Sequence, residues 1–106
     1  MKSVAAIAAE CRAEAQTQAM KWLNENAAEK LKRMVIKTYR KRKKKAFLDF
    51  VIAKGDGYGL LHSSRGMVIL VELVQSYGYL VNGDFNTDTR EISLNVGVDL
   101  TDFYDT

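Results

Sequence analysis

The side chains best suited to catalysis or metal binding are few and scattered along this sequence. His62 is the only histidine and Cys11 the only cysteine, and they lie in differently patterned segments. A zinc site needs about four nitrogen, sulfur or oxygen ligands with close pairs among them, and the sequence offers no such pairs. The acidic residues from Asp84 onward do not follow the spacing of a calcium-binding loop. We therefore expect no metal, no cofactor and no enzymatic activity.

Two short motifs invite a catalytic or phosphate-binding interpretation. His62-Ser63-Ser64 lacks the glycines that frame a nucleophile elbow, so a serine that caps a helix is the better explanation. Gly55-Asp56-Gly57-Tyr58-Gly59 has three alternating glycines. It matches neither the dinucleotide-binding fingerprint nor the P-loop. We interpret this glycine-rich stretch as a flexible turn.

The residues around Tyr58 also resemble a known family over a short stretch. Asp56-Gly57-Tyr58-Gly59-Leu60-Leu61 is similar to the glycine–aromatic–glycine–hydrophobic strand of cold-shock-type OB folds. In that family the aromatic ring stacks on a base of a single strand. The resemblance covers only these residues, and the second aromatic motif of the family is absent. It implies base stacking by Tyr58 and assigns no family to the chain.

The strongest chemical signal is the basic segment Lys37–Lys45. It holds seven of the sixteen Lys and Arg residues of the chain, and no acidic residue interrupts it. Successive residues of an α-helix advance by about 100°, so the charges from Arg40 to Lys45 encircle the axis and leave no side for burial. The segment must therefore project from the body, end a helix or form an exposed connection. Basic residues continue upstream at Lys30, Lys32 and Arg33.

The charge of the chain is divided unevenly between its halves. Residues 1–54 carry 14 Lys and Arg against 5 Asp and Glu, whereas residues 55–106 carry 2 against 8. Such asymmetry indicates an electrostatic partner for the basic half, and nucleic acid is the partner that we expect. One alternative is pairing of the basic segment with the acidic half, within one molecule or across a dimer. A membrane surface is disfavoured, because Tyr39 is the only bulky apolar residue within the segment.

We therefore expect a small non-enzymatic protein that binds DNA or RNA and acts as an accessory or regulatory protein. Its basic segment would neutralise backbone phosphates with little reading of sequence, and two tyrosines would stack on exposed bases. The predicted contact residues are Lys37, Tyr39, Arg40, Lys41, Arg42, Lys43, Lys44, Lys45 and Tyr58. The alternative function is a protein-interaction module, an inhibitor or adaptor that binds a partner through its helices or its acidic C-terminal half.

Residues 1–45 are predicted to be helical. Proline is absent from the chain and the first glycine is Gly55, so the strongest helix breakers are missing from this half. Apolar residues from Val4 to Leu23 recur at steps of three and four. Asn24–Asn26 is the expected interruption, which would give an antiparallel helical hairpin; one continuous helix is the alternative. The abundant alanines allow close helix approach, and we expect them to make a homo-oligomer, most simply a dimer.

Residues 46–100 are predicted to form an α+β unit. Residues 46–53 suit a helix or a strand, and we favour a strand, with a turn at 55–59 and a return through 60–62. A helix capped by Ser63 or Ser64 is expected to end at Tyr77 before Gly78. Asn82–Asp84 is predicted to be a turn. Residues 90–100 alternate apolar and polar side chains, which is typical of a strand with one wet face.

The fold class expected from these elements is α+β, with a helical hairpin or long helix followed by a small, mostly antiparallel sheet and one packed helix. Residues 1–106 are expected to form a single domain, in which residues 101–106 are an acidic tail whose aromatic rings dock on a partner or on the basic segment. A single cysteine allows no internal disulfide and fits a reducing, cytoplasmic compartment. The apolar run at the N-terminus is too short for a signal peptide.

Overall fold

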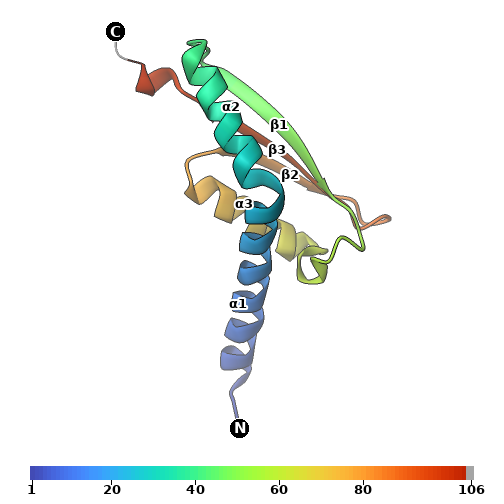
Figure 1. The fold of residues 1–106 in the computed structure, drawn as a ribbon. Helices are drawn as coiled ribbons and strands as arrows, with labels where there is room; N and C mark the ends of the chain where they lie inside the picture. Colours follow the sequence, from blue (N-terminus) through green and yellow to red (C-terminus); the bar gives the residue numbers. More distant parts are fainter. Residues whose placement is uncertain (105–106) are drawn as a thin grey trace.

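A computed structural model describes residues 1–104 of the chain (Figure 1). The fold is α+β, as predicted, with a long N-terminal helical segment, a three-stranded antiparallel sheet and one further helix. Short 3₁₀ turns at Gly59–Leu61 and Thr101–Phe103 complete it. The helices are α1 (Val4–Trp22), α2 (Ala28–Arg40) and α3 (Ser64–Ser76), and the strands are β1 (Lys45–Ile52), β2 (Leu80–Phe85) and β3 (Ile92–Asp99).

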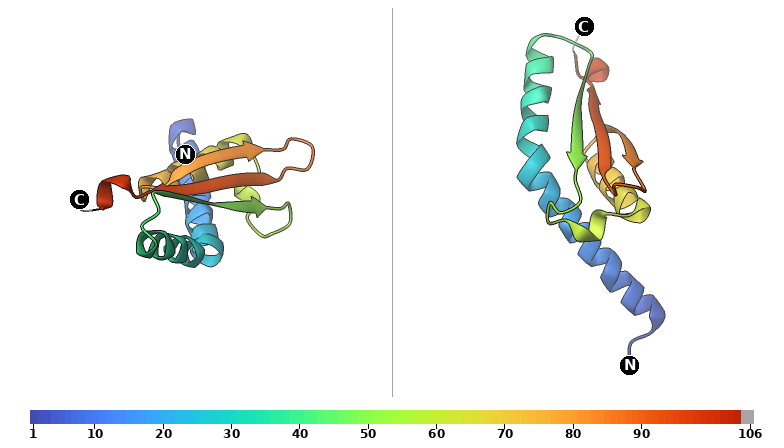
Figure 2. Two further views of the ribbon diagram at one scale, coloured as in Figure 1. Left: turned by 90° about the horizontal axis from the view of Figure 1, so that it is seen from above. Right: turned by 90° about the vertical axis from the view of Figure 1, so that its right-hand side faces the viewer.

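α1 and α2 form one continuous rod rather than a hairpin. A π-helical turn, Leu23–Ala27, joins them, and the rod runs along the whole length of the molecule (Figures 1 and 2). The interruption expected at Asn24–Asn26 is therefore at the right place, but the chain does not reverse there, and the hairpin prediction is wrong. The Asn26 side-chain amide donates to the Trp22 carbonyl at 3.1 Å. This bond gives that carbonyl a partner inside the turn, so the helix continues.

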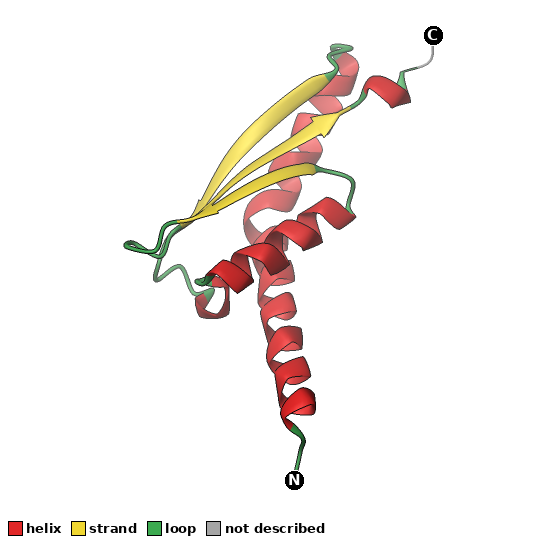
Figure 3. Ribbon diagram, turned by 180° about the vertical axis from the view of Figure 1, so that it is seen from behind, coloured by secondary structure: helices red, strands yellow, loops and turns green. Residues whose placement is uncertain are grey.

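The core lies between the helices and one face of the sheet (Figure 3). β3 is the central strand in the order β1-β3-β2, and its alternate residues from Ile92 to Val98 are buried, which confirms the strand predicted at residues 90–100. α2 packs against β1, and α3 packs against both β2 and α1. Trp22, the last residue of α1, meets Phe50 of β1 edge to face with ring centroids 5.7 Å apart. These contacts fix the rod against the sheet.

The segment between β1 and α3 differs in part from the expectation. β1 spans Lys45–Ile52, so the strand interpretation of residues 46–53 is confirmed. The prediction that the chain returns as a strand through residues 60–62 is wrong, because this stretch forms a 3₁₀ turn that packs against α1. The Ser63 hydroxyl then caps α3 by accepting from the Gly66 amide at 2.9 Å. Gly78 follows that helix with a φ of +92°, a conformation that favours glycine, so the predicted helix and both its ends are confirmed.

The turn predicted at Asn82–Asp84 is wrong, since these residues lie within β2. Gly83 is needed there for packing, because a Cβ at this position would lie 2.8 Å from a methyl group of Val71 on α3. The chain reverses later, between β2 and β3. There the Asn86 side-chain oxygen accepts hydrogen bonds from the amides of Asp88 and Thr89, as in an Asx turn.

Gly66 marks the place where α3 passes closest to the turn before it. A Cβ at Gly66 would lie 2.4 Å from the Leu61 carbonyl oxygen, which belongs to the backbone and cannot swing aside. We expect Gly66→Ala to lower the free energy of unfolding by about 1–3 kcal/mol or more, as overpacking does. Urea unfolding measures it. Gly59→Ala is the matched control, because a Cβ there meets nothing within 4 Å. Equal stability of the two variants would contradict the close approach.

The first part of α1 extends away from the rest of the molecule. Every residue from Met1 to Glu14 is exposed, and Figure 1 shows this end of the rod beyond the sheet and α3. It meets the rest of the molecule toward its end, where Arg12 pairs with Glu72 of α3 at 3.8 Å and alanines of α1 line a cavity with Leu60. The homo-oligomer expected from these alanines stays a prediction.

Candidate nucleic-acid interface

The basic segment Lys37–Lys45 lies where α2 passes into β1. Lys37 and Arg40 belong to the last turns of α2, residues 41–44 form the connecting turn, and Lys45 opens β1. All seven basic side chains of the segment are exposed. The prediction of a helix end with an exposed connection is confirmed.

The connecting turn closes α2 with the hydrogen bonds of a Schellman motif. The Lys43 amide donates to the Thr38 carbonyl and the Arg42 amide to the Tyr39 carbonyl, both at 3.0 Å. One residue of this motif has a left-handed backbone and is usually glycine. Arg42 occupies that position, with a φ of +53°. A cationic side chain therefore stands where glycine would be less strained.

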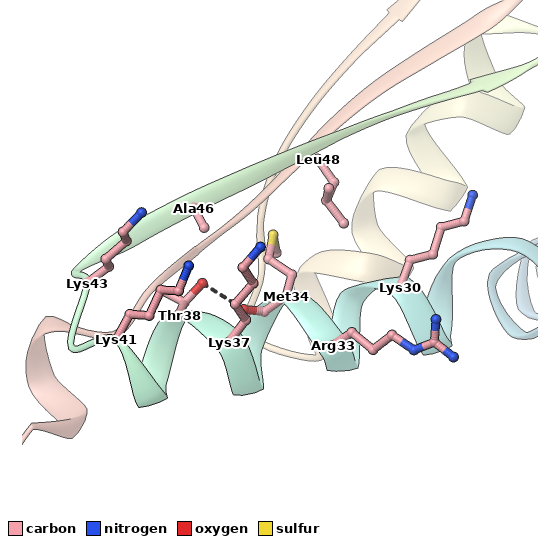
Figure 4. Close-up of a pocket in the computed structure, with 9 residues that line it drawn as sticks. All are labelled: Lys30, Arg33, Met34, Lys37, Thr38, Lys41, Lys43, Ala46 and Leu48. Carbon is pink, nitrogen blue, oxygen red and sulfur yellow. Dashed lines mark hydrogen bonds between the residues drawn. The ribbon is translucent and has the colours of Figure 1, made fainter.

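A groove between α2 and β1 gathers part of this charge, and we call it the cationic groove (Figure 4). Its volume is about 420 Å³. Its floor is mostly apolar and consists of Met34, Thr38, Ala46 and Leu48. Its rim carries five cations from α2 and the connecting turn, namely Lys30, Arg33, Lys37, Lys41 and Lys43.

Four of these cations form a row along α2. Lys30, Arg33, Lys37 and Lys41 follow one another after three or four residues, a spacing that puts them on one face of the helix. The rise of about 1.5 Å per residue separates neighbours along the axis by about 4.5–6 Å and gives the row a length of about 16 Å. The basic segment alone does not identify this row. The sequence does contain a signal for the row, namely the spacing of three or four residues between these cations. That spacing begins at Lys30 and Arg33, which lie upstream of the basic segment.

Most cations between residues 30 and 45 have no carboxylate partner within residues 1–104. Two exposed ion pairs occur, Arg33 with Glu29 at 3.5 Å and Lys45 with Asp99 at 4.0 Å. Hydrogen bonds from the Thr101 hydroxyl and amide, and then the charges of Lys45 and Lys44, lower the pKa of Asp99 below its usual value. The sequence suggested that the basic segment pairs with the acidic half. Among residues 1–104, the ion pair between Lys45 and Asp99 is the only such pairing.

The C-terminal segment docks on the connecting turn through Tyr104. Its hydroxyl lies within hydrogen-bonding distance of the Thr38 and Lys43 carbonyl oxygens. Its ring packs against Tyr39 with centroids 5.4 Å apart, and the Arg42 guanidinium lies 6.0 Å from the centroid of the same ring. Docking of the tail on the basic segment, one of its two predicted destinations, is confirmed for Tyr104. Residues 105 and 106, the end of the predicted tail, lie outside the described residues.

Tyr58 does not belong to this surface. Its side chain is only 8% exposed. Its hydroxyl accepts a hydrogen bond from the Asn26 amide at 2.9 Å and donates one to the Glu25 carboxylate at 3.2 Å. The prediction that Tyr58 stacks on a base is wrong, because burial leaves its ring no free face. The residue holds the glycine-rich loop against the π turn instead, and the strand implied by the OB-fold resemblance is a loop followed by a 3₁₀ turn.

A second groove, of about 450 Å³, runs along the other side of α2, and we call it the aromatic groove. Arg40 stands in its lining beside the exposed side chains of Ile36, Tyr39, Tyr77 and Phe103. Tyr79, which also lines the groove, is partly buried, and this burial raises its pKa above the usual value. Sequence reasoning identified Tyr39 alone, since no local pattern brings Tyr77 or Phe103 to it.

No family model, curated protein or solved structure matches this chain. The site is therefore interpreted from its own chemistry. Over residues 1–104, no three potential metal ligands lie together. None of the helices in that range combines the length and apolar character needed to cross a membrane. The fold and the site together define a small α+β protein with an exposed cationic groove.

Proposed function

We propose that this protein binds nucleic acid by holding backbone phosphates in the cationic groove, as a non-enzymatic accessory or regulatory protein. The observation that carries the proposal is the row Lys30, Arg33, Lys37 and Lys41 on one helix face, with Lys43 across the groove. In the described chain only Arg33 of these five has a carboxylate partner. Like charges three or four residues apart on a helix repel one another, and bound phosphates relieve that repulsion.

The connecting turn supports the same function. Arg42 holds a left-handed position that favours glycine, and such local strain is typical of residues retained for binding. Its neighbours Lys41, Lys43 and Lys44 have no carboxylate partner among residues 1–104 and are free to approach phosphate oxygens. Phosphate contacts position a nucleic acid without reading its sequence, so we expect little sequence preference from this surface.

Self-association belongs to this proposal. Residues 4–14 of α1 are all exposed, although Arg12 pairs with Glu72 of α3 at 3.8 Å. The small alanine side chains among them allow two such helices to approach closely. A dimer would present two cationic grooves to one nucleic acid. The second contact would then be intramolecular, which raises the overall affinity without any new type of contact.

A salt series measures the proposed contacts. Fluorescence anisotropy with a labelled DNA at about 50–200 mM salt should give an association constant that falls steeply as salt rises. Five phosphate contacts predict a slope of about −4.5 in log K against log salt for a duplex and about −3.5 for a single strand. A flat response, or no binding at the lowest salt, would refute phosphate binding by this surface.

A further inference from the structure

The aromatic groove displays an unusual amount of exposed ring surface. Tyr39, Tyr77 and Phe103 are 52%, 58% and 67% exposed, and they come from α2, the end of α3 and the C-terminal 3₁₀ turn. Single exposed apolar residues are ordinary on a protein surface, whereas several gathered in one place mark an interaction site. Phosphate contact needs none of these rings. The aromatic groove is therefore suited to a part of the ligand other than its phosphates.

The aromatic groove and the row of cations lie on different sides of α2, and Arg40 stands between them. Arg40 lines the aromatic groove and follows Lys37 by three residues, which places it about 60° further round the helix axis. A strand bound along the row can therefore reach the mouth of the aromatic groove by crossing the exposed side of α2 past Arg40. Asp99 is the one carboxylate that lines this groove, and it is already engaged by Thr101 and Lys45.

The ring of Tyr39 is held in place before any ligand arrives. Tyr104 packs against it with centroids 5.4 Å apart, and the Tyr104 hydroxyl is anchored on the backbone carbonyls of Thr38 and Lys43. A pair of rings fixed in this way loses little conformational freedom when a further ring is added, so it favours stacking of a planar ligand.

We infer that the aromatic groove takes unpaired bases of a single-stranded nucleic acid whose phosphates lie along the row of cations. The inference rests on the proposed function and deepens it. Aromatic side chains beside a positively charged groove are the usual means of binding single strands, since every base offers a face for stacking. The bases of a duplex are stacked on one another and cannot enter, so the groove selects single strands over duplexes.

Three labelled DNA probes with the same number of phosphates test this inference: an oligothymidylate of about 24 nucleotides, an abasic strand of equal length, and a G·C-rich duplex with half as many base pairs. The full chain should bind the oligothymidylate about tenfold or more tightly than either other probe. The double variant Tyr77→Ala, Phe103→Ala removes two of the three exposed rings, so it should lose most of that preference and still bind the abasic strand as the unaltered protein does. Tyr77→Phe, which keeps the ring, should retain the preference.

The control variant is Phe47→Ala. Phe47 is exposed to a similar extent, 52%, but lies on the sheet surface beside Gly97, so its replacement should leave all three affinities unchanged. Equal affinity for the three probes overturns the inference and leaves phosphate binding standing. The inference is also overturned if the double variant keeps its preference for oligothymidylate. Failure to bind any probe at low salt overturns the proposed function itself, and a protein partner for the aromatic rings is then the better explanation.

Discussion

Replacing Lys37, Lys41 and Lys43 together by glutamine is expected to weaken nucleic-acid binding about a thousandfold at 50 mM salt. Each phosphate contact contributes a slope of about −0.9 in log K against log salt, which amounts to about tenfold in affinity at 50 mM relative to 1 M salt. Glutamine keeps a long polar side chain with good helix propensity, so the fold should persist. The salt slope should fall in magnitude by about 3.

A second triple variant of equal net charge shows whether binding depends on the cationic groove or only on the overall positive charge of the protein. Lys2, Lys21 and Lys54 lie outside the cationic groove, and their replacement by glutamine removes the same charge. With both variants also compared at about 0.15 M salt, we expect this control to bind within about threefold of the unaltered protein, because distant exposed charges are largely screened there. Equal losses in the two triple variants would mean that binding follows net charge and not the groove.

Trp22→Ala is expected to destabilise the protein by about 3–5 kcal/mol, the usual range for removal of a buried aromatic side chain. Trp22 is 3% exposed and meets Phe50 edge to face, so it fixes the end of α1 on the sheet. Domains of this size are stable by about 5–15 kcal/mol, and the variant should therefore approach the limit of folding. Urea unfolding followed by circular dichroism measures the loss.

Phe103→Ala is the comparison for this prediction. It removes an aromatic ring of the exposed surface, and we expect a change of no more than about 0.5 kcal/mol in the free energy of unfolding. A loss below about 1 kcal/mol for Trp22→Ala would contradict its place in the core. The same measurement checks that the Phe103 variant used in the binding experiment is folded.

The elements that the sequence predicts well are those whose signal is local. The alternation of residues 90–100 reflects the two faces of β3, and the cap at Ser63 and the glycine at Gly78 mark the ends of α3. The basic segment was predicted to be exposed because its charges surround the helix axis, and that geometry needs no knowledge of the tertiary fold.

The features that the sequence does not reveal depend on contacts between distant segments. Gly83 resembles a turn residue until α3 is packed above it, and Tyr58 resembles a stacking residue until Asn26 is seen to hold its hydroxyl. The aromatic groove exists only because Tyr77 and Phe103 are brought to Tyr39 by the order of the strands. A local sequence pattern carries no information about which distant residues the tertiary fold brings together.

The π turn at Leu23–Ala27 makes the rod an α-helix with one inserted residue. In an uninterrupted α-helix the centre of the buried side of α1 (Ala15, Ala19 and Trp22) and that of α2 (Leu31, Met34 and Thr38) would point roughly a third of a turn apart. One extra residue corrects this phase by about 100°. This turn is therefore the place where the rod can lose a residue and keep both sides aligned. A deletion elsewhere between Ala19 and Met34 would keep that alignment only if the turn gave up its extra residue.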